Sequence, residues 1–382
     1  MPDAEQPRGH GQNTDGSRAG GGAAGADAIV VGSGVIGLTT AIALQESGVR
    51  VRIWSAAPPE DTTSAVAGAT WFPYRTSPAD RVLRWTAASK TYFDAMSGDP
   101  GLTGVHIRES LQLWREELDP DGPWWASAVP DLAHCAESEL PDGFRGGYTF
   151  TQPVVTMEVY LRFLARRFAD GGGTVTRRTV DSLDEPAAEA DAVIDCTGLA
   201  ARELAGDEDL VPVRGQVVRV ENPGISRVIA DFGHPDGEAY IIPHEDSCVL
   251  GGTAEEGVWD TEPEPSAADG IVARCTGLDS RLAGARVLDR RAGLRPVRTS
   301  GVRLEAEPER AAAGGGTGGG ALIVHNYGHG GSGVTLSWGC AEEVTALVHS
   351  GLGRGSLEED GTEPGGPDGP EAPEEPRESA GA

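Results

Sequence analysis

The chain has 382 residues, enough for one large domain or two ordinary ones with a sizeable buried core. Its formal net charge of −28 disfavours a nucleic-acid partner, because phosphate binding needs a basic surface. No apolar run reaches the roughly 20 residues that span a bilayer, and the five scattered cysteines suit neither a disulfide framework nor a metal site. We therefore expect a soluble, cytoplasmic protein with no membrane partner.

Three segments have a low-complexity composition. Residues 1–26 are Gly-rich and residues 353–382 are acidic and Pro-rich, so both are predicted to be disordered tails. Residues 311–320 (AAAGGGTGGG) predict a surface loop.

The remaining elements follow an α/β order. Residues 28–31, 35–45 and 51–54 read as strand, helix and strand; residues 157–168 form an amphipathic helix, and 174–176 and 192–195 are further strands. Several β-rich runs between residues 216 and 253 predict an antiparallel sheet. Residues 321–324 and 333–349 then give a last strand and helix. The chain is expected to leave a Rossmann-type fold and return to it.

A glycine motif stands between the first strand and the first helix. Gly32, Ser33, Gly34, Val35, Ile36 and Gly37 match G-x-G-x-x-G, in which the glycines allow a tight turn and close approach of a pyrophosphate. The following helix offers N–H groups and the positive end of its dipole. The motif predicts dinucleotide binding.

The end of the second strand departs from the usual pattern. An acid commonly meets the ribose there, but this chain has Ser55, Ala56 and Ala57, and the first acids are Glu60 and Asp61. Either the ribose is held otherwise, or one of these acids reaches back. The AVIDCTG run, ending in Thr197 and Gly198, favours a flavin over NAD when it is combined with the glycine motif.

Seven motifs occur in the order of one known family. They are VVGSGVIGLTTA, AGATWFPY, DCTGLAAREL, PVRGQVVRV, AYIIP, GLRPVR and HNYGHGGSGVT. The chain resembles the D-amino-acid oxidase family, related to D-aspartate oxidase and glycine oxidase, from about residue 27 to 349. The resemblance implies an FAD-binding domain (residues 27–75, 150–215 and 290–352) and a substrate domain with a mostly antiparallel sheet (residues 76–149 and 216–289).

The resemblance also implies a reaction. The family moves hydride from the α-carbon of a D-amino acid to flavin N5, O2 reoxidises the flavin to give H2O2, and the imino acid hydrolyses to a 2-oxo acid and ammonia. The expected cofactor is FAD, and the expected partners are O2 and a neutral or apolar D-amino acid. A homodimer is one option for the assembly.

Site residues follow from the same resemblance. Arg295 matches the carboxylate-binding arginine, whose planar fork suits bidentate contact, and Tyr240 matches a tyrosine that meets the same carboxylate. Both are implied as catalytic residues, and Gly331 as a further substrate contact. The implied cofactor contacts beyond the glycine motif are Thr62, Thr63, Ser64, Ala69, Thr70, Val180, Thr197, Gly198, Arg295, Gly330, Gly331, Gly333, Val334 and Thr335. His325 and His329 are left without a role.

Other functions stay open at this point. D-Aspartate oxidase shares the scaffold but needs a second cation, for which Arg298 and His244 are candidates. A glycine- or sarcosine-type amine oxidase is a further option within the family. Outside the family, an NAD-dependent dehydrogenase is disfavoured by AVIDCTG, and a non-catalytic binding protein by the presence of both Arg295 and Tyr240.

Overall fold

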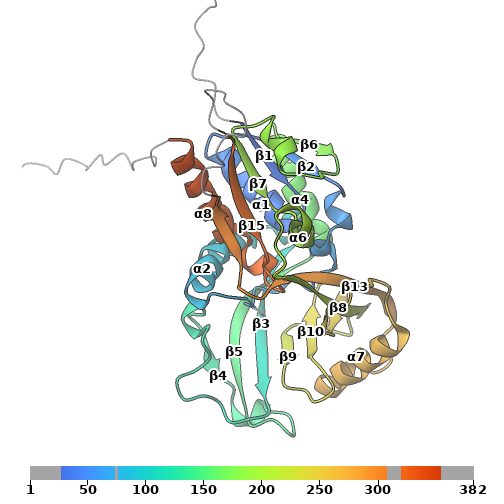
Figure 1. Ribbon diagram of the computed structural model, residues 1–382. Coiled ribbons are helices and arrows are strands. Elements are labelled where there is room, and N and C mark those ends of the chain that lie inside the picture. Colours follow the sequence, from blue (N-terminus) through green and yellow to red (C-terminus); the bar gives the residue numbers. More distant parts are fainter. Residues whose placement is uncertain (1–26, 74–75, 308–319, 354–382) are drawn as a thin grey trace, which may run out of the picture.

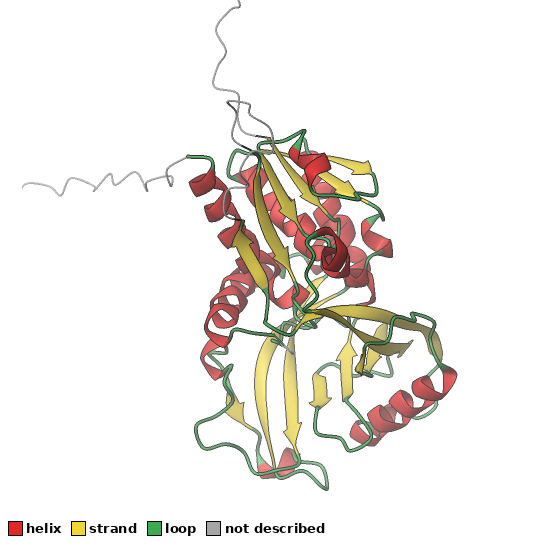
Figure 2. Cartoon of the chain, in the orientation of Figure 1, coloured by secondary structure: helices red, strands yellow, loops and turns green. Residues whose placement is uncertain are grey.

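The structure is a computed structural model that describes residues 27–73, 76–307 and 320–353. The predicted tails and the predicted loop at 311–320 fall outside these residues, apart from Gly353 and Gly320. The described chain forms two β-sheets, which lie one above the other in Figure 1. Most helices gather around the upper sheet, as Figure 2 shows.

The upper sheet contains the strands that were predicted for the nucleotide-binding fold. Its strand order is β14-β15-β7-β1-β2-β6, with β14 antiparallel to β15 and the other pairs parallel. The strands are β1 (Asp27–Val31), β2 (Arg50–Ser55), β6 (Thr174–Arg177), β7 (Ala192–Asp195), β14 (Arg303–Ala306) and β15 (Leu322–Tyr327). The predicted α/β fold class is confirmed.

Helices bury both faces of this sheet. Those in the main core are α1 (Val35–Glu46), α2 (Ala79–Met96), α4 (Met157–Asp170) and α8 (Gly333–Gly351). Ala28 and Val30 of β1 belong to that core, whereas Ile29 and Val31 pack on the other face with Leu183, just before the short helix α5 (Asp184–Ala187). Burial on both faces explains why these strands read as uninterrupted apolar runs.

The lower sheet has nine strands, most of them antiparallel. They are β3 (Val105–Trp114), β4 (Ala133–His134), β5 (Gly146–Val155), β8 (Leu210–Glu221), β9 (Val228–Asp231), β10 (Ala239–Pro243), β11 (Ser247–Gly251), β12 (Glu255–Glu256) and β13 (Val287–Arg298). One pair, β3 with β9, is parallel. Leu111 and Leu113 pack with helix α7 (Pro265–Leu278) on the outer face, so the alternating Ser110 and Gln112 lie on the inner face.

Sheet membership does not follow the domain boundaries expected from the sequence. Strand β13 pairs along its length with β8 in the lower sheet, although its residues from 290 onward were expected in the FAD-binding domain. Conversely, α2 packs on α8, where the Gly339 N–H donates to Ser89 Oγ at 2.9 Å. The short helices α3 (Pro100–Thr103) and α6 (Ala201–Leu204) complete the α-helices of the described chain.

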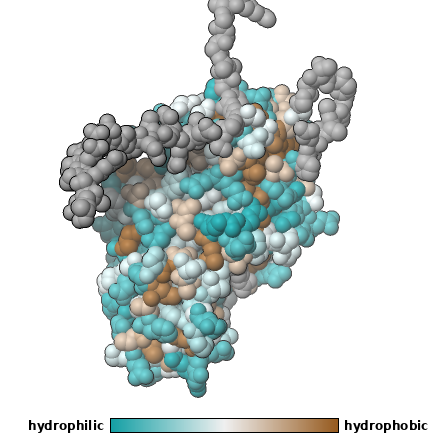
Figure 3. Space-filling model, turned by 90° about the vertical axis from the view of Figure 1, so that its left-hand side faces the viewer, coloured by the Kyte–Doolittle hydropathy of each residue, from teal (hydrophilic) through white to brown (hydrophobic). Residues whose placement is uncertain are grey.

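The surface is mostly polar on the face that Figure 3 shows. In Figure 3, hydrophilic residues cover most of the visible face, and apolar residues form small separate groups. Within the described ranges, every helix is too short or too polar to cross a membrane.

Candidate active site

A large cavity lies where strands of the upper sheet end. It measures about 440 Å³ and is lined by residues at the carboxyl ends of β1 and β2 and by those that follow β7. Ligands of open α/β sheets bind in such crevices, at the carboxyl ends of the strands. The sequence-predicted residues that line this cavity are Gly32, Ser33, Gly34, Val35, Ile36, Thr62, Thr63, Ser64, Val180, Thr197, Gly198, Gly330, Gly331, Gly333 and Val334.

The glycine motif is shaped by close backbone packing. Gly32 has a positive φ of 113°, and a Cβ there would collide with the carbonyl oxygen of Cys196. A Cβ at Gly37 would collide with the carbonyl of Gly32, so Gly37 permits the helix to pack on the loop and does not itself line the cavity. Helix α1 begins after Gly34. The Val35 N–H donates to Ser64 Oγ at 3.0 Å, and the next N–H groups of the first turn remain for an anion.

Two buried polar atoms of residues that line the larger cavity fit a polar ligand. Asn326 Oδ1 and His329 Nε2 have no hydrogen-bond partner among the described residues, and both side chains line the cavity. Burial lowers the pKa of His329 to about 3, so its imidazole is neutral near pH 7. Buried polar atoms are seldom left unpaired in folded proteins. The oxygen and the ring nitrogen therefore suit the polar edges of a nucleotide cofactor such as FAD.

The end of β2, where an acid commonly meets the ribose, lines the larger cavity. Ser55 Oγ shares a 2.8 Å hydrogen bond with Ser33 Oγ, which ties the end of β2 to the glycine motif. Asp61 lines the cavity and Glu60 does not, so Asp61 is the acid placed to reach back. Arg178 was not predicted from the sequence; it also lines this cavity, and its guanidinium lies 3.9 Å from the centre of the Trp54 ring.

A smaller cavity of about 150 Å³ adjoins the larger one. Thr63, Ala67, Gly331 and Val334 line both. Tyr240 and Arg295 line the smaller cavity, together with Ala69 and Thr70, which the sequence analysis expected to contact the cofactor. Thr335 lines neither: its hydroxyl accepts from the Phe72 N–H at 3.1 Å and so holds this segment in place.

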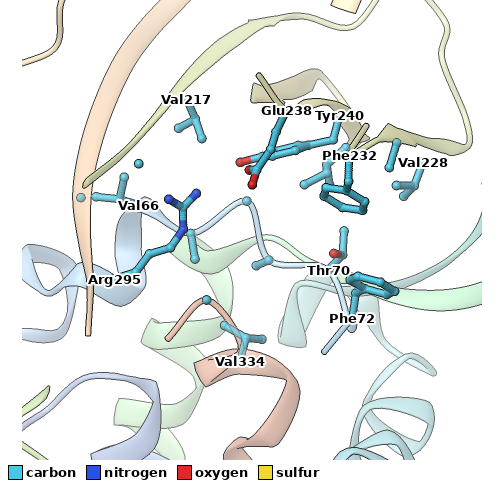
Figure 4. A pocket seen from close by; sticks show the side chains of 18 of the residues that line it. Val66, Thr70, Phe72, Val217, Val228, Phe232, Glu238, Tyr240, Arg295 and Val334 are labelled. Atoms are coloured by element: carbon cyan, nitrogen blue, oxygen red, sulfur yellow. The ribbon is translucent and has the colours of Figure 1, made fainter. Parts of the chain in front are cut away.

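The position of Arg295 depends on a neighbouring glycine. Strand β13 places Arg295 opposite Val213 of β8, and its Nη1 donates to the Thr253 carbonyl oxygen at 2.9 Å. A Cβ at Gly215 would overlap the guanidinium, so this glycine makes room for it. In Figure 4 the guanidinium points into the cavity, toward Tyr240 and Glu238.

Tyr240 faces Arg295 from strand β10. A Cβ at Gly251, its partner on β11, would collide with the tyrosine ring, and one at Gly252 would crowd the hydroxyl. Burial raises the pKa of Tyr240 above its usual value, and the charge of Arg295 offsets part of this rise. The hydroxyl is therefore protonated near neutral pH and can donate a hydrogen bond, as the guanidinium does. The two groups together can bind a carboxylate.

Most of the remaining wall of the smaller cavity was not predicted from the sequence. It is formed by Val66, Gly68, Phe72, Gln112, Gln152, Val217, Val228, Ala230, Phe232, Glu238, Ile242 and Gly293. Phe72 and Phe232 stack with ring centres 5.7 Å apart. Alternation along β3 and β9 could have suggested inward side chains, but the sequence does not say that these strands border a cavity.

Neither candidate for a second substrate-binding cation lines the smaller cavity. Arg298 donates to Asp207 at 2.8 Å, in a network with Tyr327 and Arg303. His244 Nδ1 lies 3.1 Å from Thr156 Oγ1, and burial lowers the pKa of His244 to about 4. Neither side chain belongs to the lining that the structure describes.

Comparison with known proteins gives consistent results. The family described as "FAD dependent oxidoreductase" matches residues 27–347. A D-amino-acid oxidase of Rubrobacter xylanophilus is 52% identical over 327 residues, which cover 86% of this chain and 97% of that protein. A D-amino-acid oxidase of Streptomyces coelicolor is 44% identical over 325 residues, which cover 84% of this chain and 96% of that protein. The crystal structure of glycine oxidase from Geobacillus kaustophilus matches with a TM-score of 0.70 at 19% identity, and the match covers 85% of this chain and 95% of that structure's chain.

Proposed function

The chain belongs to the D-amino-acid oxidase family of FAD-dependent oxidoreductases, and from this premise we propose that it oxidises D-amino acids with neutral or apolar side chains. The observation that carries the proposal is the meeting of Arg295 and Tyr240 in a mostly apolar cavity. That cavity shares a wall with a larger one whose glycine loop and unpaired polar atoms fit FAD.

The overall reaction converts a D-amino acid, O2 and water into a 2-oxo acid, ammonia and H2O2. Bound FAD supplies the acceptor for the two electrons and the hydrogen that leave the α-carbon, and it passes them to O2. The protein holds the substrate. Arg295 and Tyr240 fix the carboxylate, which limits the orientations in which the α-carbon can approach the shared wall formed by Gly331 and Val334.

Helix α8 contributes charge stabilisation at the shared wall. It begins at Gly333, and its N-terminal cap residue Ser332 makes no side-chain cap. The first-turn N–H groups and the positive end of the helix dipole therefore face this region and stabilise negative charge there. Apolar side chains such as Val228, Phe232 and Ile242 limit the access of water to the smaller cavity.

The structure gives the D-aspartate oxidase alternative less support. A distal carboxylate needs a cation, and Arg295 is the one cation in the described lining of the smaller cavity. Arg298 is engaged by Asp207, and His244 is neutral near pH 7. A neutral or apolar side chain matches the apolar wall better. The cytoplasmic location and the option of a homodimer stay predictions from the sequence, which cell fractionation and light scattering would test.

The proposal is tested by product stoichiometry. With FAD and D-alanine, we expect equal amounts of H2O2, ammonia and 2-oxo acid, and none from L-alanine. Arg295→Leu should abolish most of this turnover, because the carboxylate loses its charged partner. Arg166→Leu is the matched control, since its side chain is 76% exposed on α4, outside both cavities. Equal turnover of the two variants would contradict the assignment of Arg295.

A further inference from the structure

A buried histidine of β15 bridges two carboxylates in the upper sheet. His325 and Asp195 are both fully buried, and the register of β15 with β7 places them opposite each other. His325 Nδ1 lies 3.3 Å from Asp195 Oδ2, and its Nε2 lies 2.9 Å from Glu307 Oε1. Burial of a carboxylate is unfavourable unless the group is paired and hydrogen-bonded. The imidazole provides this pairing for one oxygen of Asp195.

The other oxygen of Asp195 holds the segment that follows β7. Asp195 Oδ1 accepts from the Thr197 N–H at 3.1 Å and from the Thr197 hydroxyl at 2.6 Å. Thr197 and Gly198 line the larger cavity. The same segment packs on the glycine motif, because a Cβ at Gly32 would collide with the Cys196 carbonyl oxygen. The orientation of the Asp195 carboxylate therefore positions this part of the cavity wall.

The other charged and titratable groups around His325 make different contacts. Glu305, its partner across β14, has a side chain that is 59% exposed and pairs with an arginine of the same strand. Tyr327 lies nearly perpendicular to the imidazole, with ring centres 5.4 Å apart, and packs with Ala201 of α6. Arg202 of that helix donates to backbone carbonyls. In the described chain, the two carboxylates are therefore the charged groups within hydrogen-bond distance of the imidazole.

The two carboxylates make different demands on the ring in its two protonation states. A neutral imidazole has one N–H and can donate to one carboxylate, whereas the protonated ring donates to both. Histidine side chains commonly change between these states between about pH 5 and 8. Loss of one ring proton therefore releases either Asp195 or Glu307. The hold on Asp195 is firmest when the ring carries both protons, and it weakens as the pH rises.

We propose that His325 is a positioning residue for the FAD cavity: its imidazole fixes Asp195 in the orientation that accepts both Thr197 hydrogen bonds. The inference rests on FAD binding in the larger cavity, as the proposed function requires, and it gives a part to a side chain that the substrate chemistry does not use. His325 is not in the described lining of that cavity, so it acts through Asp195 and Thr197. The affinity for FAD should therefore depend on the donors of the ring.

The first test measures the Kd for FAD from flavin fluorescence as the loaded, full-length protein is diluted. His325→Leu removes both donors, His325→Asn keeps a donor near the Nδ1 position, and His325→Gln keeps one near the Nε2 position. At pH 6.5 we expect His325→Leu to raise the Kd by about fivefold or more, the effect of one lost hydrogen bond to a charged group, and His325→Asn to restore it to within about twofold. His134→Leu, at an exposed position on β4, is the matched control and should leave the Kd unchanged.

Two outcomes of this test overturn the proposal. One is a Kd for His325→Leu equal to that of the wild type, and the other is restoration by His325→Gln but not by His325→Asn. If His325→Leu does not fold, the comparison of the two amide variants decides, because the proposal requires the lower Kd in His325→Asn.

The pH profile separates positioning from general structural support. The wild-type Kd should rise by about threefold or more from about pH 5.5 to 8.5, whereas His325→Asn, which does not titrate, should keep a nearly constant Kd. A wild-type Kd that is independent of pH, or an equal rise in His325→Asn, overturns the proposal. A wild-type protein that binds no FAD at any pH would instead contradict the proposed function.

Discussion

Replacement of Gly215 by alanine tests the geometry around Arg295 without removing the arginine. The added methyl group would overlap three guanidinium atoms, Nη1, Cζ and Nη2. These atoms are the far end of a flexible side chain, so the side chain can swing away. We therefore expect Gly215→Ala to displace the guanidinium from the cavity while the protein still folds.

The size of the effect follows from the contacts that would be lost. Arg295 Nη1 would lose its hydrogen bond to the Thr253 carbonyl, at a cost of about 1 kcal/mol in the free energy of unfolding. The substrate carboxylate would lose two charge-assisted hydrogen bonds of about 1.5–3 kcal/mol each. At about 1.4 kcal/mol per tenfold change, kcat/KM for D-alanine should fall by about 100-fold or more.

The assay is steady-state H2O2 formation, with thermal unfolding measured on the same samples. Gly277→Ala is the matched control, because a Cβ at this position in α7 meets nothing within 4 Å. That substitution should leave kcat/KM unchanged and stabilise the helix by about 0.5–1 kcal/mol. Retention of kcat/KM within threefold in Gly215→Ala would refute the placement of Arg295 as the carboxylate ligand.

Three further predictions concern the tyrosine, the buried histidine and the glycine motif. The pKa of Tyr240 is raised above its usual value of about 10, so its hydroxyl keeps its proton and donates a hydrogen bond at neutral and mildly alkaline pH. Deprotonation removes this donor, so kcat/KM should fall above pH 10, and Tyr240→Phe should remove that fall. A fall attributable to Tyr240 below pH 9 would contradict this. His329→Leu should raise the Kd for FAD by about 2–10-fold in a fluorescence titration, the effect of one neutral hydrogen bond, and an unchanged Kd would exclude the contact. Gly37→Ala should lower the unfolding temperature by several degrees and weaken FAD retention, because the new methyl group meets rigid backbone at Gly32; an unchanged Tm would be inconsistent with that packing.

The nucleotide-binding fold could be predicted because its signals are local. The apolar runs that became β1 and β7 are short and bounded by glycine turns, and the motif from Gly32 to Gly37 stands directly between a strand and a helix. The position of β13 could not be predicted in the same way. Its residues read as a strand in either sheet, and only pairing with β8 assigns it to the lower one.

The candidate site was predictable only in part, for a related reason. Arg295 and Tyr240 carry recognisable motifs, and the structure brings them to one cavity. Gln112 and Gln152 have no motif, because a glutamine on an alternating strand reads as a solvent-facing residue. Their burial results from two strands, β3 and β5, that border the cavity through long-range pairing. Neighbouring residues alone do not encode such an environment.

Anaerobic absorbance spectroscopy tests the central claim most directly. The purified, FAD-loaded protein is titrated without oxygen, first with L-alanine and then with D-alanine. The account predicts flavin absorbance bands that L-alanine leaves unchanged and D-alanine bleaches, because the chain belongs to the D-amino-acid oxidase family. Bleaching by L-alanine, or a protein that shows no flavin bands even after FAD is added, would contradict it.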